Sequence, residues 1–305
     1  MKKFDVAAIA SDVARSEEQA RLRDAAELLI EQMRLNEAGA FATEFVQALR
    51  PVVTLQAPDG PVHFRGGHGR LIWRVDSFFE EEPDTIEWLD SMTEDDVLWD
   101  VGSNVGMYSL YAAKLRRSTV YAFEPESQNY ATLCENIALN RVGDRCVPVM
   151  AAVSRRAGFG ELAVRYVTKG GAYNQFTGAD QEDIAGPTSV ETAGNAGPEI
   201  RQVVYGISLD ELLDDPYFKA PTRLKGDVDG READIFDGAG KLLRDRRLRG
   251  IMVELNRAFE RDMAIPSMLE GLGFAKTAER SNWDYREDRS RESEYPTVNM
   301  IFARD

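Results

Sequence analysis

The sequence has few of the residues that build disulfide frameworks or metal sites. Its 305 residues include only two cysteines, Cys134 and Cys146, and two histidines, His63 and His68. The cysteines form no C-x-x-C pair and lie far from the histidines. We therefore expect both to be reduced thiols, and neither a disulfide nor a zinc site is predicted.

The chain also lacks long apolar runs and an excess of basic residues. No uninterrupted apolar block follows the N-terminal residues, so the sequence predicts neither a signal peptide nor a membrane span, and we expect a cytoplasmic protein. The formal net charge is −15. Nucleic acids and anionic membranes attract basic surfaces, so this charge disfavours both as partners. A small or neutral acceptor is favoured instead.

A third absence is the G-x-G-x-x-G turn with which dinucleotide-binding domains commonly hold a pyrophosphate. In its place, the apolar stretch 97–101 runs into the sequence Asp100-Val-Gly-Ser-Asn-Val-Gly106. The two glycines allow a sharp turn and close approach of a ligand to the backbone. The carboxylate at the strand end would repel a pyrophosphate, but it suits a cationic or hydroxyl-bearing ligand.

A second acidic residue ends the next predicted strand, eighteen residues after Gly106. It is Glu124, in the sequence Phe123-Glu124-Pro125. A carboxylate at this position can accept two hydrogen bonds from a ribose diol. Together with Asp100 it indicates a nucleoside without phosphates, and S-adenosylmethionine is the common one.

From residue 97 onward, strand and helix patterns alternate, which predicts parallel strands joined by right-handed crossovers. The expected strands are 97–101, 119–123, 147–150, 223–228, 250–255, 274–278 and 297–303, and helices are expected at 106–115 and 127–139. The polar run 279–295 is too charged for a buried crossover helix. The last two strands should therefore pair as a hairpin, and the predicted fold is α/β, a mostly parallel doubly wound sheet with an antiparallel C-terminal edge.

The segment before this domain has a different pattern. Residues 12–49 carry apolar positions at helical spacing and predict two or three amphipathic helices, while residues 52–75 alternate like strands and predict a β-hairpin. We divide the chain into an N-terminal helical and hairpin segment, 1–90, and a main domain, 91–305. The N-terminal segment would cap the site, bind the acceptor or form a homo-oligomer contact.

A long run between residues 168 and 198 is rich in Gly, Ala, Asp, Glu and Thr and has few large apolar residues. Loops of this length inside a compact domain are uncommon, and they often serve as lids or binding loops. The run therefore predicts a mobile substrate lid or a passive insertion.

Five motifs, taken in order, resemble the FkbM family of S-adenosylmethionine-dependent methyltransferases. They are 100–106, 123–125, Asn136-Ile-Ala-Leu-Asn140, Ser208-Leu-Asp-Glu-Leu212 and Leu224-Lys-Gly-Asp-Val-Asp-Gly230, and the match spans about residues 95–257. The resemblance implies a class I, Rossmann-like methyltransferase that usually methylates oxygen on a sugar, polyketide or related small molecule. The sequence departs from the family at Gly226, where a large aliphatic residue is general, and at Asp229, where Glu is usual.

The resemblance implies S-adenosylmethionine as cofactor, S-adenosylhomocysteine as product, and a small-molecule or saccharide acceptor. Related enzymes commonly contact adenine through backbone after the third strand, where Ala152 lies. The residues predicted to bind the cofactor are Asp100, Gly102, Ser103, Asn104, Gly106, Glu124, Pro125, Ala152 and Asp227.

Methyl transfer to a hydroxyl is an in-line displacement, and the hydroxyl proton must be removed as the bond forms. Asp227 ends the strand expected beside the first one, and Asp229 follows two residues later. Glu254 and Asn256 repeat this spacing on the next strand, and residues two apart share a face. We therefore expect these four side chains to converge near the methyl group.

Three interpretations of these residues stay open. In the first, Asp227 or Asp229 is the general base, and Lys225 pairs with a carboxylate or orients the acceptor. In the second, Asp227, Asp229, Glu254 and Asn256 bind a divalent cation such as Mg²⁺ that acidifies the hydroxyl. In the third, Asp229 caps a helix and Glu254 is an ordinary strand-end carboxylate.

The two histidines are open to two interpretations as well. They are surface or turn residues, or one of them, with His68 the candidate, is a general base that reaches over the site from the N-terminal segment.

The function favoured by these patterns is O-methylation by a methyltransferase. A nicotinamide-dependent oxidoreductase is an alternative enzyme, but Asp100 and the missing G-x-G-x-x-G turn count against it. A non-catalytic nucleoside-binding or scaffold protein of the same fold is the alternative from a different class.

Overall fold

The computed structural model describes residues 51–66, 69–165, 169–172, 174–178, 200–281 and 296–305. By its internal contacts the chain divides into two units, 1–51 and 52–305. The helices expected within 12–49 lie outside the described residues. The boundary that we expected after residue 90 falls inside the second unit, and the roles expected for the N-terminal segment stay predictions.

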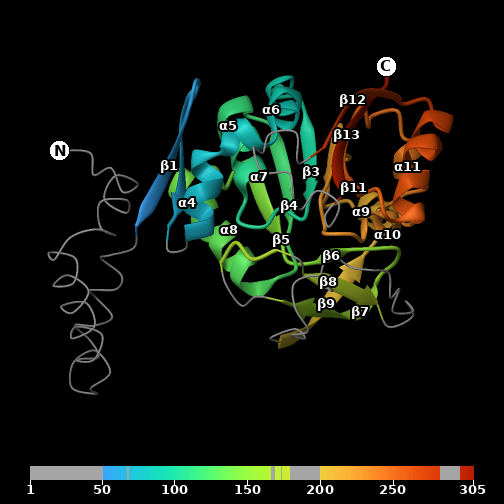
Figure 1. Cartoon of the computed structure of the whole chain (residues 1–305), viewed down its shortest axis with the longest axis horizontal. Helices are drawn as coiled ribbons and strands as arrows, with labels where there is room; N and C mark the ends of the chain where they lie inside the picture. Colours follow the sequence, from blue (N-terminus) through green and yellow to red (C-terminus); the bar gives the residue numbers. More distant parts are fainter. Residues whose placement is uncertain (1–50, 67–68, 166–168, 173, 179–199, 282–295) are drawn as a thin grey trace, which may run out of the picture. The chain divides into compact units, whose positions relative to one another are not determined.

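A seven-stranded sheet forms the centre of the second unit (Figure 1). Its order is β12 (Ala275–Ser281), β13 (Thr297–Ala303), β11 (Gly250–Asn256), β10 (Arg223–Gly226), β3 (Val97–Val101), β4 (Thr119–Phe123) and β5 (Cys146–Val149). The neighbours from β11 to β5 are parallel, whereas β13 is antiparallel to both β11 and β12. The predicted α/β sheet and its antiparallel C-terminal edge are confirmed.

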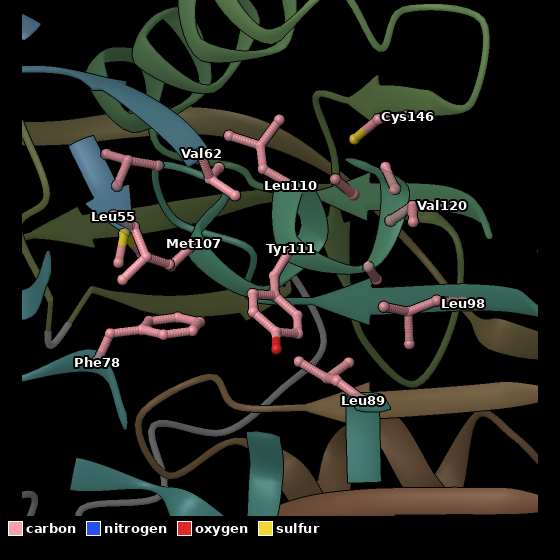
Figure 2. Packing of buried hydrophobic residues seen from close by; sticks show 14 of the residues in the cluster. Leu55, Val62, Phe78, Leu89, Leu98, Met107, Leu110, Tyr111, Val120 and Cys146 are labelled. Carbon is pink, nitrogen blue, oxygen red and sulfur yellow. The ribbon is translucent and has the colours of Figure 1, made fainter. Parts of the chain in front are cut away.

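Alternate residues of the strands face two separate helical layers. On one face, Leu98, Val120 and Met252 pack with α4 (Gly69–Asp76), α5 (Phe78–Glu81), α6 (Pro83–Asp90), α7 (Met107–Tyr111), the π-helical turn Ala112–Arg116 and α8 (Ser127–Asn140). Figure 2 shows Leu110 and Tyr111 of α7 within this layer. On the other face, Trp99, Tyr121 and Val253 pack with α9 (Leu209–Asp214), α10 (Glu232–Asp237), the 3₁₀ turn Leu242–Arg244 and α11 (Glu260–Gly271). The sheet is therefore doubly wound, with a buried layer on each side.

The expected hairpin consists of β1 (Val52–Ala57) and β2 (Gly60–Arg65). Two asparagines one turn apart on α8 hold it: Asn136 Oδ1 accepts a hydrogen bond from the Arg65 amide, and Asn140 Oδ1 accepts one from the His63 amide. The prediction of strand structure up to residue 75 is wrong, because 69–76 form a helix. Leu71 and Val75 are both buried, and this four-residue spacing is helical.

A second, four-stranded sheet lies between β5 and α9 in the sequence, and we did not predict it. Its order is β6 (Ala152–Val153), β9 (Ile200–Ile207), β7 (Gly158–Val164) and β8 (Gln175–Gly178). Strand β8 falls within the run that we interpreted as a loop, while 179–199 lie outside the described residues. Phe159, Val203 and Tyr205 leave large apolar side chains exposed on this sheet, so its strands lack the alternation that usually reveals them.

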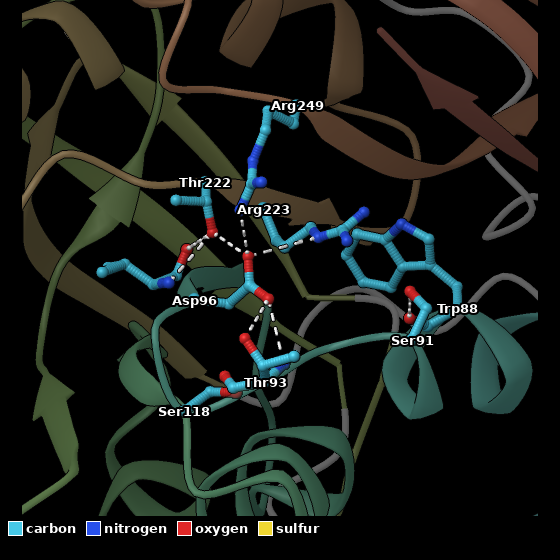
Figure 3. A network of polar contacts seen from close by, with 9 residues as sticks. Trp88, Ser91, Thr93, Asp96, Ser118, Thr222, Arg223 and Arg249 are labelled. Atoms are coloured by element: carbon cyan, nitrogen blue, oxygen red, sulfur yellow. Dashed lines mark hydrogen bonds and ion pairs between the residues drawn. The ribbon is translucent and has the colours of Figure 1, made fainter. Parts of the chain in front are cut away.

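At the amino ends of the central strands, Asp96 gathers polar groups from three segments (Figure 3). Its carboxylate accepts hydrogen bonds from the Thr93 amide at 2.9 Å, the Thr222 hydroxyl at 2.6 Å and the Arg249 guanidinium at 3.0 Å. Burial alone would raise the pKa of Asp96, but these hydrogen bonds and the arginine charges outweigh it and hold the pKa below its ordinary value. The network ties together the starts of β3, β10 and β11, at the end of the sheet away from the predicted site.

Candidate active site

A cavity opens at the carboxyl ends of β3, β4 and β10, which is where ligands bind in open α/β sheets. It encloses about 1000 Å³ of empty space, its mouth included. Ten of the predicted site residues line it: Asp100, Gly102, Ser103, Asn104, Glu124, Pro125, Ala152, Lys225, Asp227 and Asp229. Glu254, Asn256 and Gly106, also predicted, are not among its lining residues.

The glycine turn after β3 packs directly against the end of β10. Gly102 has a φ of +81°, and a Cβ there would lie 1.8 Å from the backbone oxygen of Asp227. Gly106 has a φ of +88°, and its Cβ would lie 2.5 Å from Leu133. The positive φ angles agree with the sharp turn that we expected, and packing between protein segments adds a requirement for glycine that we did not predict. The expected approach of a ligand stays a prediction.

Asp100 places a carboxylate with a free acceptor in the cavity wall. The residue is only 1% exposed, and its Oδ2 accepts a hydrogen bond from the Ser109 hydroxyl. Its Oδ1 is buried and has no hydrogen-bond partner within the described ranges, and the same holds for Ser103 Oγ. Burial raises the pKa of Asp100, and Lys225 opposes this rise. A buried acceptor without a partner is costly unless a ligand donates to it, so this wall fits a ligand that carries hydrogen-bond donors.

Glu124 lies beside this turn with both of its oxygens oriented by backbone amides. Its Oε2 accepts from Asn104 at 2.8 Å, and its Oε1 accepts from Glu126 at 2.9 Å. Burial raises the pKa of Glu124 to about 7, although these hydrogen bonds oppose the rise. Each oxygen retains acceptor capacity for a further donor, which suits the predicted contact with a ribose diol.

The first described residues of the predicted lid are fixed beside the cavity. Asn129 Oδ1 accepts a hydrogen bond from the Gly170 backbone amide at 2.8 Å. The side-chain Nδ2 groups of Asn129 and Asn104 both donate to the Gly171 backbone oxygen. The start of the run is therefore anchored to the turn after β3. Whether the run acts as a lid stays a prediction, because 179–199 lie outside the described residues.

Lys225 is a buried cation in the cavity wall, and it lies opposite Asp100 in the register of β10 and β3. Its side chain is 1% exposed, and its Nζ lies 3.0 Å from Asp227 Oδ2 and 4.9 Å from the centre of the Tyr108 ring. Burial would lower the pKa of Lys225, but the charges of Asp227, Asp100 and Glu82 outweigh it and raise the pKa. Lys225 therefore pairs with a carboxylate, as one of our interpretations has it.

Sequence reasoning missed Glu82, which lies between α5 and α6. Its carboxylate accepts hydrogen bonds from the hydroxyls of Thr85, at 3.0 Å, and Tyr108. Burial raises the pKa of Glu82, and Asp227 adds to the rise, while Lys225 opposes it. No motif covers this segment, and a glutamate next to a proline at a helix start is too common to mark a site.

Two of the four oxygen-bearing side chains that we expected to converge lie in the cavity wall, and their convergence near the methyl group stays a prediction. Asp227 and Asp229 line the cavity, and their charges help to raise the pKa of Glu254, after burial as the first cause. Asn256 does not join them, because its Oδ1 accepts from the Ala258 amide in a local turn. Within the part of the chain that the structure describes, no group of three or more His, Cys, Asp or Glu side chains is arranged to hold a metal ion. The Mg²⁺ interpretation thus finds no support there.

The histidines give a limited result. The His63 ring lies on the hairpin, where Nδ1 is 3.0 Å from the Thr54 hydroxyl, and His63 is not among the residues that line the cavity. His68 lies outside the described residues, so its suggested catalytic role stays a prediction. Among the described residues, no helix is long and apolar enough to cross a membrane.

Comparison with known families decides the relationship. The model of the methyltransferase FkbM domain matches residues 100–285. This chain belongs to the FkbM methyltransferase family. It is similar to the hexuronic acid methyltransferase AglP of Haloferax volcanii, with 26% identity over 185 residues that make up 61% of this chain and 66% of that protein. It is also similar to methyltransferase 1 of Beauveria bassiana, with 28% identity over 62% of this chain and 76% of that protein.

Solved structures of similar proteins include the methyltransferase FkbM from Methylobacillus flagellatus, with a TM-score of 0.43 and 12% identity, covering 70% of this chain and 44% of that one. Another is M. jannaschii TYW2 in complex with AdoMet, with a TM-score of 0.43 and 15% identity, covering 83% and 87%. The chain therefore spans slightly less than two thirds of AglP and less than half of the M. flagellatus chain. The Rossmann-like fold itself follows from the strand order β12-β13-β11-β10-β3-β4-β5 described above.

Proposed function

We propose that this FkbM-family protein is an S-adenosylmethionine-dependent O-methyltransferase that acts on a saccharide or related small-molecule hydroxyl. One observation carries the proposal. One cavity is lined by the Asp100 carboxylate, which has an unpartnered oxygen, by the Glu124 carboxylate and by the Lys225–Asp227 ion pair. The first two suit the binding of a nucleoside, and the ion pair suits the orientation and deprotonation of a hydroxyl. The names of AglP and methyltransferase 1 support the same reaction class, and AglP supports a uronic acid or other sugar as acceptor.

The residues fit the cofactor as follows. Glu124 would accept hydrogen bonds from the ribose hydroxyls, Asp100 and Ser103 would bind the amino acid end, and the backbone at Ala152 would contact adenine. When bound, S-adenosylmethionine supplies an electrophilic methyl group on a sulfonium. These assignments agree with the lining of the cavity.

The carboxylates at the end of β10 have separate duties in this proposal. Asp227 is paired with Lys225 at 3.0 Å, which fixes the direction of its carboxylate, so it orients the acceptor hydroxyl. Asp229, two residues on in the same wall, removes the hydroxyl proton as the methyl group is transferred. If the roles are reversed, Asp227→Asn will reduce kcat more than Asp229→Asn does.

The test is titration calorimetry with S-adenosylmethionine, S-adenosylhomocysteine and NADH on the wild-type chain and on Glu124→Ala. We expect micromolar binding of both adenosyl ligands, loss of that binding in the variant, and no binding of NADH. Binding without turnover on any uronic acid or neutral sugar would favour a nucleoside-binding scaffold protein. Absence of adenosyl binding would contradict the proposal.

A further inference from the structure

Arg74 is a cation in the cavity wall that comes from outside the region matched by the family model. It lies on α4, whose buried residues Leu71 and Val75 pack into the core at 4% and 5% exposure. A residue three positions after Leu71 and one before Val75 lies next to the same buried stripe. Arg74 is half-buried there and lines the cavity. A guanidinium therefore occupies a position where an apolar side chain is usual.

The other two cations of the cavity wall have ion-pair partners. Lys225 lies 3.0 Å from Asp227, and Arg231 lies 3.1 Å from Asp234. For Arg74, the structure gives no ion pair and no side-chain hydrogen bond among the described residues. Half-buried arginines are normally paired, because a guanidinium carries five donors that need acceptors.

Arg74 shares the cavity wall with Tyr108. The charge of Arg74 opposes the rise in the pKa of Tyr108 that burial and the neighbouring Glu82 cause. The Tyr108 ring lies 4.9 Å from Lys225 Nζ. Arg74 therefore lies in the wall of the same cavity as Tyr108, Lys225 and Asp227.

We infer that Arg74 binds a carboxylate group of a ligand in this cavity. A guanidinium is always charged, and its planar fork matches the two oxygens of a carboxylate. The inference rests on the proposed function, under which two ligands can supply this group. One is the amino acid end of S-adenosylmethionine, and the other is a uronic acid acceptor.

The first arm of the test compares two nucleosides that differ in the amino acid end. S-adenosylhomocysteine carries a carboxylate, whereas 5′-methylthioadenosine has no amino acid end. If Arg74 binds the cofactor, Arg74→Gln will weaken S-adenosylhomocysteine about 10- to 100-fold, as the loss of a charge-assisted hydrogen bond does. The affinity for 5′-methylthioadenosine will stay unchanged, and Arg74→Lys will restore part of the loss.

The second arm applies if both nucleosides bind Arg74→Gln as they bind the wild type. The wild-type chain, saturated with S-adenosylhomocysteine, should then bind D-glucuronate more tightly than D-glucose, and Arg74→Gln should remove this preference. Arg246→Gln is the matched control, because Arg246 is exposed and is not among the lining residues.

Two outcomes separate the inference from the proposed function. If Arg74→Gln changes neither S-adenosylhomocysteine affinity nor a glucuronate preference, or if the wild type has no such preference while S-adenosylhomocysteine is unaffected, the role of Arg74 is refuted. If the wild type binds neither nucleoside, the proposed function fails, and the role of Arg74 then depends on whether the ligand-free chain prefers glucuronate to glucose. A melting curve of Arg74→Gln identifies any loss of folding.

Discussion

A buried carboxylate lies near each end of strand β3, and the two differ in their hydrogen-bond partners and in the direction of their pKa shifts. Asp96, 2% exposed, precedes the strand and receives hydrogen bonds on both oxygens. Asp100, 1% exposed, lies near its carboxyl end and keeps one oxygen without a partner among the described residues. The pKa of Asp96 is lowered, whereas that of Asp100 is raised. The comparison teaches that a buried carboxylate stabilises a fold when its partners are protein groups, and favours a ligand when they are missing.

The largest expected effect is at the amino end of the sheet. Asp96→Ala removes the acceptor of Thr93, Thr222 and Arg249 and should lower the free energy of unfolding by about 3 kcal/mol, measured by urea denaturation. Affinity for S-adenosylhomocysteine should not change. Asp144→Ala is the control, because Asp144 pairs with Arg145 at the surface, where such a pair contributes little.

The pH dependence of this effect has a definite sign. Because the pKa of Asp96 is lowered on folding, its stabilisation is present above the ordinary value of 3.8 and is lost as the pH falls through the folded value. The difference in stability between the wild type and Asp96→Ala should therefore shrink in acid. A difference that grows in acid would contradict the network's role.

At the carboxyl end, Asp100→Asn should have the opposite profile. Affinity for S-adenosylhomocysteine should fall about 10- to 100-fold under the proposed function, because the cavity wall loses a carboxylate. The raised pKa means that ionising Asp100 costs folding free energy as the pH rises above its ordinary value, so the neutral variant should be at least as stable as the wild type at pH 8. A clear loss of stability with unchanged affinity would assign Asp100 to the core instead.

A smaller effect follows from the pKa of about 7 at Glu124. The ionised form accepts hydrogen bonds from ribose, so the affinity for 5′-methylthioadenosine should be constant above pH 8 and fall by up to about tenfold per pH unit below 7. This ligand is chosen because it has no amino acid end to titrate. Glu124→Gln should bind weakly at every pH, and a pH-dependent Glu124→Gln would contradict the assignment.

The smallest effect concerns two glycines at the carboxyl ends of the neighbouring strands β3 and β10. A Cβ at Gly226 would meet only Val253, at 3.8 Å, so Gly226→Ala should stabilise the chain by about 0.5 to 1 kcal/mol without altering ligand affinity. Gly102→Ala is the matched contrast, because its Cβ would overlap the Asp227 oxygen at a positive φ. It should destabilise the chain, and equal melting temperatures for the two variants would contradict this packing.

The parts that could be predicted from the sequence are those whose signal is local. Strands β3, β4 and β13 have their predicted bounds, because each is a short apolar run that ends at a turn or a charged residue. Asp100 and Glu124 were found because the strand, turn and helix that place them are consecutive. The helix at 69–76 was missed because the glycines before it suggested turns.

The residues that surround Lys225 and the arginine in the cavity wall could not be predicted in the same way. Arg74 lies on α4, Glu82 between α5 and α6, and Tyr108 on α7, and the proximity of Glu82 and Tyr108 to Lys225 depends on how these segments pack on β3 and β10. Nothing in the spacing along the chain encodes that packing. Asn256 was wrongly placed because two residues on one face of a strand diverge when the second begins a turn.

The four-stranded sheet leaves and rejoins the domain at a single point. The Ser154 amide donates to the Ile207 oxygen at 2.9 Å, and β6 pairs in parallel with the end of β9. Leu162 and Phe176 from within this excursion line the cavity. Because of this arrangement, the segment between Ser154 and Ile207 can be lengthened, shortened or replaced during evolution without shifting the register of the seven-stranded sheet. A change in this segment can therefore alter the wall of the cavity while the turn after β3 keeps its own packing.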